Sequence, residues 1–418
     1  MELLILPREK RRERIYIKMN SAALRKTNIS TYDGDRVRDN TILLQAGLLI
    51  SLLTSIIFYF QAIHYKGLYL ADLPAHISQA LSMENYSVVF LLMKWAYTVS
   101  GNSLYFIGLI QGVTVGLAFV CTTVALEKLF SLKRIVSGAV AICLLTLTSI
   151  YIPFIYPRFY NGPVISQPWH NITYSSMRPF SVLTIFFFAY LHEIYKNEKR
   201  ISWKYWILTS VNLVLATLAK PNYLMGFAPA LLVFLLVDFF GKKNTFKNEF
   251  LLGCVVLPAV AVLPIQAVLL FNENNSIAIG PSTFFFSEGA FIVIMKFVTA
   301  LPLPLLVYFH NRHRLKYGAG VAGLSFVWAV LEGMFMMEKG PREMHGNFLW
   351  GSEITGYILF MYVYGMLLRD LKEYRTGEVP KNSGTRSYLI ISLILAAMHV
   401  VSGLVYFSFI VRGHNYYI

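Results

Sequence analysis

The sequence carries little charge for its length. Of its 418 residues, 14% are charged and 56% are hydrophobic, whereas soluble globular chains have about 25% charged and about 45–50% apolar residues. The apolar residues fall in blocks of roughly 17–25, the length that a helix needs to cross about 30 Å of hydrocarbon. The composition therefore argues against a water-soluble protein and predicts an all-α, polytopic transmembrane helical bundle.

Cysteine and the familiar catalytic motifs are also scarce. The three cysteines, Cys121, Cys143 and Cys254, all lie inside apolar blocks, where a thiol behaves as a small hydrophobic group. Their spacing indicates neither a disulfide framework nor a zinc site. The sequence contains no Walker A motif, no GxSxG and no HExxH, so ATP hydrolysis and thiol chemistry find no support.

The formal net charge of +15 suits a nucleic-acid partner or the basic cytoplasmic loops of a membrane protein. The distribution of the charge favours the second interpretation and no nucleic acid. The sequence predicts about eleven spans. They cover residues 42–63, 104–126, 135–156, 178–195, 205–219, 222–240, 250–271, 290–309, 318–334, 350–368 and 387–411.

With the N-terminus in the cytoplasm, every predicted inside segment holds at least three lysines or arginines, and no outside connection holds more than two. This alternation satisfies the positive-inside rule and places the C-terminus outside. Residues 1–41 are expected to form a basic cytoplasmic tail against anionic lipid, and residues 42–418 a single transmembrane domain in the cell membrane. The inside segments are 1–41, 127–134, 196–204, 241–249, 310–317 and 369–386.

The first outside loop contains ADLPAHI. If a helix starts here, Asp72 and His76 lie four residues apart on one face, where a carboxylate and an imidazole together can take a proton from a hydroxyl group. The alternative is that Asp72 only caps the helix. The segment 86–100 is shorter than a span and contains Lys94, so it is expected to be an interfacial or re-entrant helix.

Two further connections carry candidate ligand-binding residues. Trp169 and His170 stand together in the second outside loop, either as a platform for a sugar ring or as part of an interfacial aromatic belt. Lys220 lies between two short predicted spans. It is expected either to bind an anion such as a lipid phosphate or to extend to the surface as a snorkelling lysine.

The outside loop 335–349 concentrates charged residues. Arg342 suits bidentate binding of a phosphate, and His345 suits neutralisation of a leaving group. The alternative is a solvated charge cluster, but Gly346 and several aromatic residues favour a packed loop. The candidate binding residues of this loop are Glu338, Arg342, Glu343 and His345.

With an acidic residue in the first outside loop, a short helix after it, and basic and aromatic residues in later outside loops, the sequence resembles the integral membrane glycosyltransferases of the GT-C superfamily. That superfamily includes protein mannosyltransferases and aminoarabinose transferases. The resemblance covers residues 42–368 as an architecture. Many members have two adjacent acidic residues in the first loop, whereas Leu73 follows Asp72 here. A divalent metal is therefore compatible with the family but unsupported by this sequence.

The resemblance implies a polyprenyl-phosphate sugar as donor, entering from the membrane lipids, and a glycan, lipid or protein as acceptor. Asp72 would be the general base, assisted by His76, and direct displacement would invert the anomeric centre. Lys220 and Arg342 would stabilise the departing phosphate.

Two other functions remain open. A lipid-linked polysaccharide polymerase or ligase also has many spans, but it usually depends on one large late loop, and the late loops here are short. A transporter or flippase of lipid-linked glycans is expected to carry ionisable residues at mid-membrane depth and an inverted repeat. The sequence shows no repeat, and its predicted spans are nearly free of charge at their centres.

Overall fold

The computed structural model describes most of the chain as helix, in which backbone hydrogen bonds are satisfied internally, as an apolar environment requires. The described residues are 38–67, 69, 71–82, 87–156, 167, 169–242, 246–270, 276–316, 318–340 and 343–413. The chain divides into two compact units, Met1–Gly47 and Leu48–Ile418. In the first unit, residues 38–47 are helical, and most of the predicted basic tail lies outside the described residues.

Every segment predicted to cross the membrane contains a helix. Among the described residues, six helices are long and apolar enough to span, or seven if a bent pair counts as one span. The first helix is Arg38–Ala62. It is followed by η2 (Tyr65–Gly67), α2 (Leu73–Ser82), α3 (Val88–Val99), α4 (Leu104–Phe130), α5 (Arg134–Leu145), α6 (Ile172–Glu198), α7 (Trp203–Ala219), α8 (Asn222–Lys242), α9 (Phe246–Gly253), η3 (Cys254–Val256), α10 (Leu257–Val260), α11 (Val262–Leu270), β1 (Ser276–Ile279), α12 (Thr283–Phe286), α13 (Ala290–Ala300), α14 (Pro302–Asn311), α15 (Ala319–Phe335), β2 (Met336–Lys339), η4 (Glu343–His345), η5 (Asn347–Leu349), α16 (Trp350–Thr376) and α17 (Ser383–Val411).

Three predicted spans are less regular than expected. The span predicted at 135–156 is wrong in its second half, because α5 ends at Leu145 and residues 146–156 are not helical. The span at 290–309 is bent by 50° between α13 and α14, where Pro302 opens the second helix. Prolines likewise divide the span at 250–271 into α9, α10 and α11. The short helix α3, with 12 residues, reaches only about 18 Å and cannot span on its own.

Small residues allow close packing near the start of the bundle. In α4, Gly108 and Gly112 face the second half of the helix Arg38–Ala62. A Cβ atom on Gly112 would clash with the carbonyl oxygen of Ser51. Glycines four residues apart let two helix backbones approach closely where lipid offers no hydrophobic drive for association.

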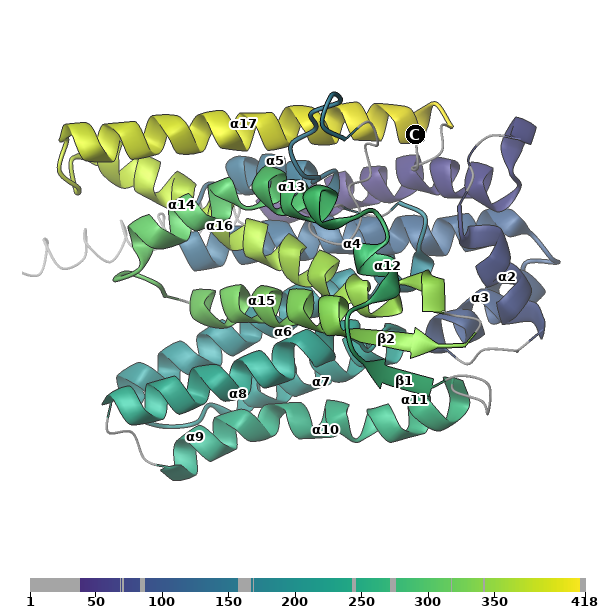
Figure 1. Cartoon of the computed structure of the whole chain (residues 1–418), viewed down its shortest axis with the longest axis horizontal. Coiled ribbons are helices and arrows are strands. Elements are labelled where there is room, and N and C mark those ends of the chain that lie inside the picture. Colours follow the sequence, from purple (N-terminus) through teal and green to yellow (C-terminus); the bar gives the residue numbers. More distant parts are fainter. Residues whose placement is uncertain are drawn as a thin grey trace, which may run out of the picture. The chain divides into compact units, whose positions relative to one another are not determined.

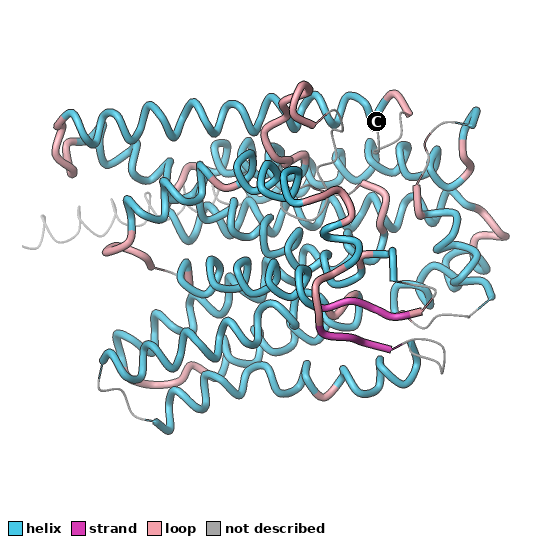
Figure 2. Tube along the Cα trace, in the orientation of Figure 1, coloured by secondary structure: helices cyan, strands magenta, loops and turns pink. Residues whose placement is uncertain are grey.

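A two-stranded antiparallel sheet joins two connections that are distant in sequence. Strands β1 and β2 pair with Ser276 opposite Lys339 and Ile279 opposite Met336, and they are the strands found in the described part of the chain (Figure 2). The sheet lies at the same end of the helices as α2 and α3 (Figure 1). The two predicted outside loops 272–289 and 335–349 therefore lie on the same side.

Predicted inside connections also meet one another. The side-chain amide of Asn248 donates to the carbonyl oxygen of Lys199 at 3.3 Å, which joins the segments 196–204 and 241–249. Buried Asp370 accepts hydrogen bonds from Asn311 at 2.7 Å, Arg314 at 2.9 Å and the Tyr388 hydroxyl at 2.8 Å. This Asp370 network clamps the ends of α14, α16 and α17 together.

Candidate functional site

Asp72 and His170 come from two different connections and meet. Asp72 directly precedes α2, and its carbonyl oxygen accepts the first helical hydrogen bond, from the backbone amide of His76 at 2.9 Å. His170 precedes α6, whose start is set by the Asn171 side chain accepting from the amide of Tyr174 at 2.9 Å. The Asp72 Oδ2 atom lies 3.7 Å from His170 Nε2, and 40% of the Asp72 side chain is exposed. Asp72 therefore occupies the position directly before the first turn of α2 and also presents its carboxylate to solvent.

Burial controls the protonation of the two histidines. It lowers the pKa of His76 to about 4 and that of His170 to about 4, even though nearby Asp72 raises both values. Both imidazoles are therefore neutral near pH 7. At 3.7 Å the contact between His170 and Asp72 is longer than a hydrogen bond, a length common in sites that tighten only when substrate binds.

Lys220 reaches the same cluster from the connection between α7 and α8. Its amide closes α7 by donating to the carbonyl of Ala216 at 2.8 Å, and Pro221 follows. Its ammonium donates to the Thr173 hydroxyl at 3.2 Å and lies 4.5 Å from the centre of the Trp350 ring. This is a geometry for cation–π attraction, which holds the lysine within the cluster rather than extended into solvent.

Carboxylates surround this ammonium group. Burial lowers the pKa of Lys220 to about 8, and the negative charges of Asp72, Glu353 and Glu338 oppose the shift. The lysine is therefore mostly protonated at pH 7 and loses its charge as the pH rises through about 8. These partners connect the loop before α2 with the loop before α16.

The aromatic residue beside the cluster is Trp350 rather than Trp169. The Trp169 ring is buried, 5.9 Å from the ring of Phe58 and 4.9 Å from that of Phe407. The Trp350 ring lies 5.7 Å from the His170 ring and also beneath Lys220. The feature of the sequence that could have indicated this role for Trp350 is its position directly after the charged loop 335–349.

The sheet holds the loop 335–349 in place. Glu338, on β2, is buried and accepts a hydrogen bond from the side chain of Asn347 at 2.9 Å. Asn347 in turn accepts at its carbonyl oxygen from Asn222, the first residue of α8, at 2.7 Å. Glu338 is thereby tied to the helix that follows Lys220.

Glu343 lies in the same loop, at the start of η4. It accepts from the Thr283 hydroxyl at 2.8 Å and pairs with Lys339 at 3.4 Å. Both hydrogen bonds lower the pKa of Glu343, and the one from Thr283 has the larger effect. Arg342 lies outside the described residues, as does the side chain of His345, so their predicted roles stay predictions.

Glu338 and Glu343 line the same shallow surface hollow. The other lining residues are Ser282, Gly333, Met336, Met337, Gly346, Asn347, Phe348 and Leu349.

Arg178 is a buried residue near the site. It is not among the site residues predicted from the sequence. Its guanidinium lies 5.0 Å from the Tyr174 ring and 5.4 Å from the Tyr357 ring. Its Nε and Nη1 atoms are buried without hydrogen-bond partners. The signal was a single arginine at the start of an apolar block, which is costly in a membrane and usually functional.

Within the described ranges, no three histidine, cysteine, aspartate or glutamate side chains converge as ligands for a metal ion. The cluster instead combines an accessible carboxylate, two neutral imidazoles and one cation, a set suited to proton transfer beside an anionic group. The sequence matches no protein-family model and no curated protein. The arrangement of these side chains on a multi-pass helical protein is therefore the basis for inferring function.

Proposed function

We propose that the protein is a membrane glycosyltransferase of the GT-C type. It transfers a sugar from a polyprenyl-phosphate donor to an acceptor hydroxyl on the non-cytoplasmic side of the cell membrane. The observation that carries the proposal is the convergence of Asp72, His170 and Lys220, which three separate connections bring to one end of the helices. A general base beside a partly buried cation is what a transfer from a lipid phosphate requires.

In the proposed step, the acceptor oxygen attacks the anomeric carbon while its proton passes to the Asp72 carboxylate. The bond between that carbon and the phosphate oxygen breaks, and its electron pair leaves with the lipid phosphate. Lys220 stabilises the charge on that phosphate, and single displacement inverts the anomeric centre. Neutral His170 and His76 orient Asp72, and Arg342 and His345 assist at the phosphate.

The sugar and the acceptor would occupy the space bordered by Trp350 and by the hollow at Glu338 and Glu343. Carboxylate oxygens accept hydrogen bonds from sugar hydroxyls, whereas they repel an anionic acceptor. Acceptors that carry hydroxyl groups and are neutral or cationic are therefore favoured over anionic ones. Trp169, the residue before His170, packs against Phe58 and Phe407.

We further propose eleven spans, with the N-terminus in the cytoplasm and the C-terminus outside. The contacts between predicted inside connections, and between predicted outside connections, support this alternation. The helix α3 is proposed to lie in the interface rather than to cross the membrane.

Reporter fusions test this topology. Reporters placed after Tyr65 and after Gly340 are expected to show a non-cytoplasmic location, because both positions lie in loops with few basic residues. A fusion after Lys199 serves as the cytoplasmic control. A cytoplasmic signal at Gly340 would overturn the topology and remove the proposed site from the donor's side of the membrane.

The pH dependence of transfer tests Lys220. Because its pKa is about 8, the rate is expected to fall as the pH rises through 8 and the ammonium loses its proton. Lys220→Arg keeps the charge at higher pH, so its alkaline decline should move upward by more than one pH unit. Lys220→Ala should weaken apparent donor binding most below about pH 8, where the wild-type lysine is charged. An alkaline limb that is the same in wild type and Lys220→Arg would assign the titration to another group.

Transport of a lipid-linked glycan is the second candidate function. Ionisable residues lie buried inside the helices: His192 of α6 and Asp238 of α8 approach to 3.6 Å, and both carboxyl oxygens of Glu332 in α15 are buried without a hydrogen-bond partner. Such residues are frequent in transporters. Purified protein in detergent distinguishes the two functions, since transfer needs no membrane compartment and transport does.

A further inference from the structure

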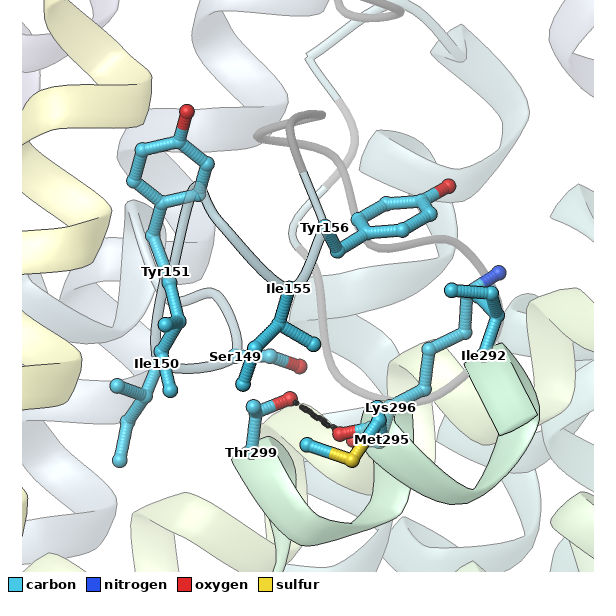
Figure 3. A pocket seen from close by; sticks show the side chains of 10 residues that line it. Ser149, Ile150, Tyr151, Ile155, Tyr156, Ile292, Met295, Lys296 and Thr299 are labelled. Carbon is cyan, nitrogen blue, oxygen red and sulfur yellow. Dashed lines mark hydrogen bonds between the residues drawn. The ribbon is translucent and has the colours of Figure 1, made fainter.

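Lys296 and Lys220 both hold their ammonium groups over an aromatic ring, but their charged partners differ. Lys296 of α13 lies beside Tyr156 (Figure 3), and its ammonium forms an ion pair with Glu288 at 2.5 Å. Lys220 instead lies over Trp350 and donates its hydrogen bond to a hydroxyl group. In the described part of the chain, no carboxylate forms an ion pair with Lys220, so its charge depends on carboxylates that act from farther away.

Three carboxylates act on the Lys220 ammonium, and each comes from a different element. They are Asp72 before α2, Glu353 in the first turn of α16 and Glu338 on β2. Among the described residues, the other titratable groups that face the ammonium are the imidazoles of His76 and His170. Burial lowers the pKa of both imidazoles to about 4, so they are neutral near pH 7. The carboxylates are therefore the charges that keep the lysine protonated.

The proposed transfer step changes one of these three charges. Asp72 takes the proton of the acceptor hydroxyl, so its carboxylate becomes neutral while the lipid phosphate leaves. The Asp72 side chain is also 40% exposed, and water weakens the attraction between exposed charges. The charge on Lys220 at the moment of transfer therefore depends on Glu353 and Glu338. Glu338 already accepts a hydrogen bond from Asn347, which draws its carboxylate toward the loop 335–349.

Glu353 is placed by the close approach of α16 to α8. Trp350 and Glu353 are three residues apart on α16, so they lie on one face of the helix. A Cβ atom on Gly351 would be in tight contact with the carbonyl oxygen of Asn222, two residues after Lys220. The Glu353 side chain is 2% exposed, so salt and water screen its charge little. The first turn of α16 thus offers the lysine both an aromatic face and a buried carboxylate.

The charge of Glu353 also acts on a second residue of the cluster, the Tyr174 hydroxyl. The Tyr174 ring lies 6.0 Å from the Trp350 ring. The guanidinium of Arg178 lies 5.0 Å from the same tyrosine ring. A buried carboxylate requires cations nearby, and Arg178 and Lys220 provide them.

We propose that Glu353 is a positioning residue of the transfer site, whose buried carboxylate holds the Lys220 ammonium charged while Asp72 takes the proton. This role rests on the proposed function and adds the group that supports the lysine from within the helices. A lysine has three donors, of which the Thr173 hydroxyl accepts one. A carboxylate in direct contact would compete with the phosphate for the others, whereas one at a distance preserves the charge and leaves the donors accessible.

Competitive labelling of Lys220 tests its charge without any transfer. Purified protein in detergent is acetylated with acetic anhydride over a series of pH values, and peptide mass spectrometry gives the midpoint at which Lys220 becomes reactive. In the wild type this midpoint should report the pKa of Lys220, about 8. Glu353→Gln should lower the midpoint by about half a pH unit or more, because removal of an opposite charge favours the neutral amine.

Three variants serve as controls for this shift. Glu353→Asp keeps the charge and should restore most of the midpoint. Glu249→Gln makes the same substitution at a buried carboxylate in the predicted inside connection 241–249, and it should leave the midpoint of Lys220 unchanged. Glu353→Leu covers the case in which the glutamine variant fails to fold, and it should lower the midpoint as much.

The pH profile of sugar transfer gives a second readout. In Glu353→Gln the alkaline decline of the rate should move to lower pH by the same amount. In a Lys220→Arg background the same substitution should leave the decline in place, since a guanidinium stays charged. An unchanged Lys220 midpoint in both Glu353→Gln and Glu353→Leu would overturn the role of Glu353, as would an equal shift in Glu249→Gln. A shifted midpoint in a protein that transfers no sugar from a polyprenyl phosphate would support the link between Glu353 and Lys220 and overturn the proposed function instead.

Discussion

Replacing Asp72 with asparagine is expected to lower the turnover of sugar transfer at least about 100-fold while leaving membrane insertion normal. Asparagine keeps the size of the side chain and its ability to cap α2, but it cannot accept the proton of the acceptor hydroxyl. That hydroxyl ionises far above neutral pH, so a base is needed as the proton leaves in the transition state. The measurement is product formation by purified protein at saturating polyprenyl-phosphate sugar and saturating acceptor.

Two controls separate a catalytic role for Asp72 from a capping role. His76→Ala should cost less, because a neutral histidine orients the base without taking the proton. Glu198→Gln, at an exposed position with an ion pair of its own, should leave turnover unchanged. Near wild-type turnover in Asp72→Asn would make Asp72 a helix cap. Glu338 would then be the first base to test, since the lowered pKa of Glu343 makes it a weaker one.

Replacing Asp370 with alanine is expected to lower the stability of the protein by about 3–5 kcal/mol, the usual cost of removing one partner from a buried charge network. Asn311, Arg314 and Tyr388 would each lose a hydrogen bond at the junction of α14, α16 and α17. Thermal unfolding in detergent, followed by fluorescence at one scan rate, measures the change.

An exposed ion pair provides the contrast for this experiment. Arg200 and Glu198 have side chains that are 67% and 49% exposed, and exposed pairs contribute about 0–1 kcal/mol. Glu198→Gln should therefore shift the unfolding temperature very little. If Asp370→Ala shifts it equally little, the clamp at the ends of these helices does not hold them together.

Most of the helical fold could be predicted from the sequence because apolar block length reports directly on what a membrane-spanning helix requires. The break after Leu145 could not, since the groups that hold the non-helical segment 146–156 come from α13 and α17, far away in sequence. Local hydropathy contains no term for such long-range partners. The strands β1 and β2 were missed for the same reason, because neither is stable without the other.

Most residues of the candidate site could be predicted from the sequence, whereas the contacts between them could not. Asp72, His76, His170 and Lys220 were each identified within their own loops, and the structure brings them together. Local patterns did not predict that Trp350, rather than Trp169, is the tryptophan beside Lys220. Trp169 packs inside and Trp350 faces the lysine, a difference that depends on which ring the neighbouring helices cover.

The pairing of β1 with β2 has a consequence for the order in which the protein matures. Ser276 leaves the ribosome well before its partner Lys339, and α13, α14 and α15 lie between them. At a synthesis rate of about 5–20 residues per second, β2 is made on the order of several seconds after β1. The loop that carries Glu338 and Glu343 thus takes its final form only after α15 is in place. A chain stopped before Met336 would contain Asp72, His170 and Lys220 and still lack the hollow lined by Glu338 and Glu343.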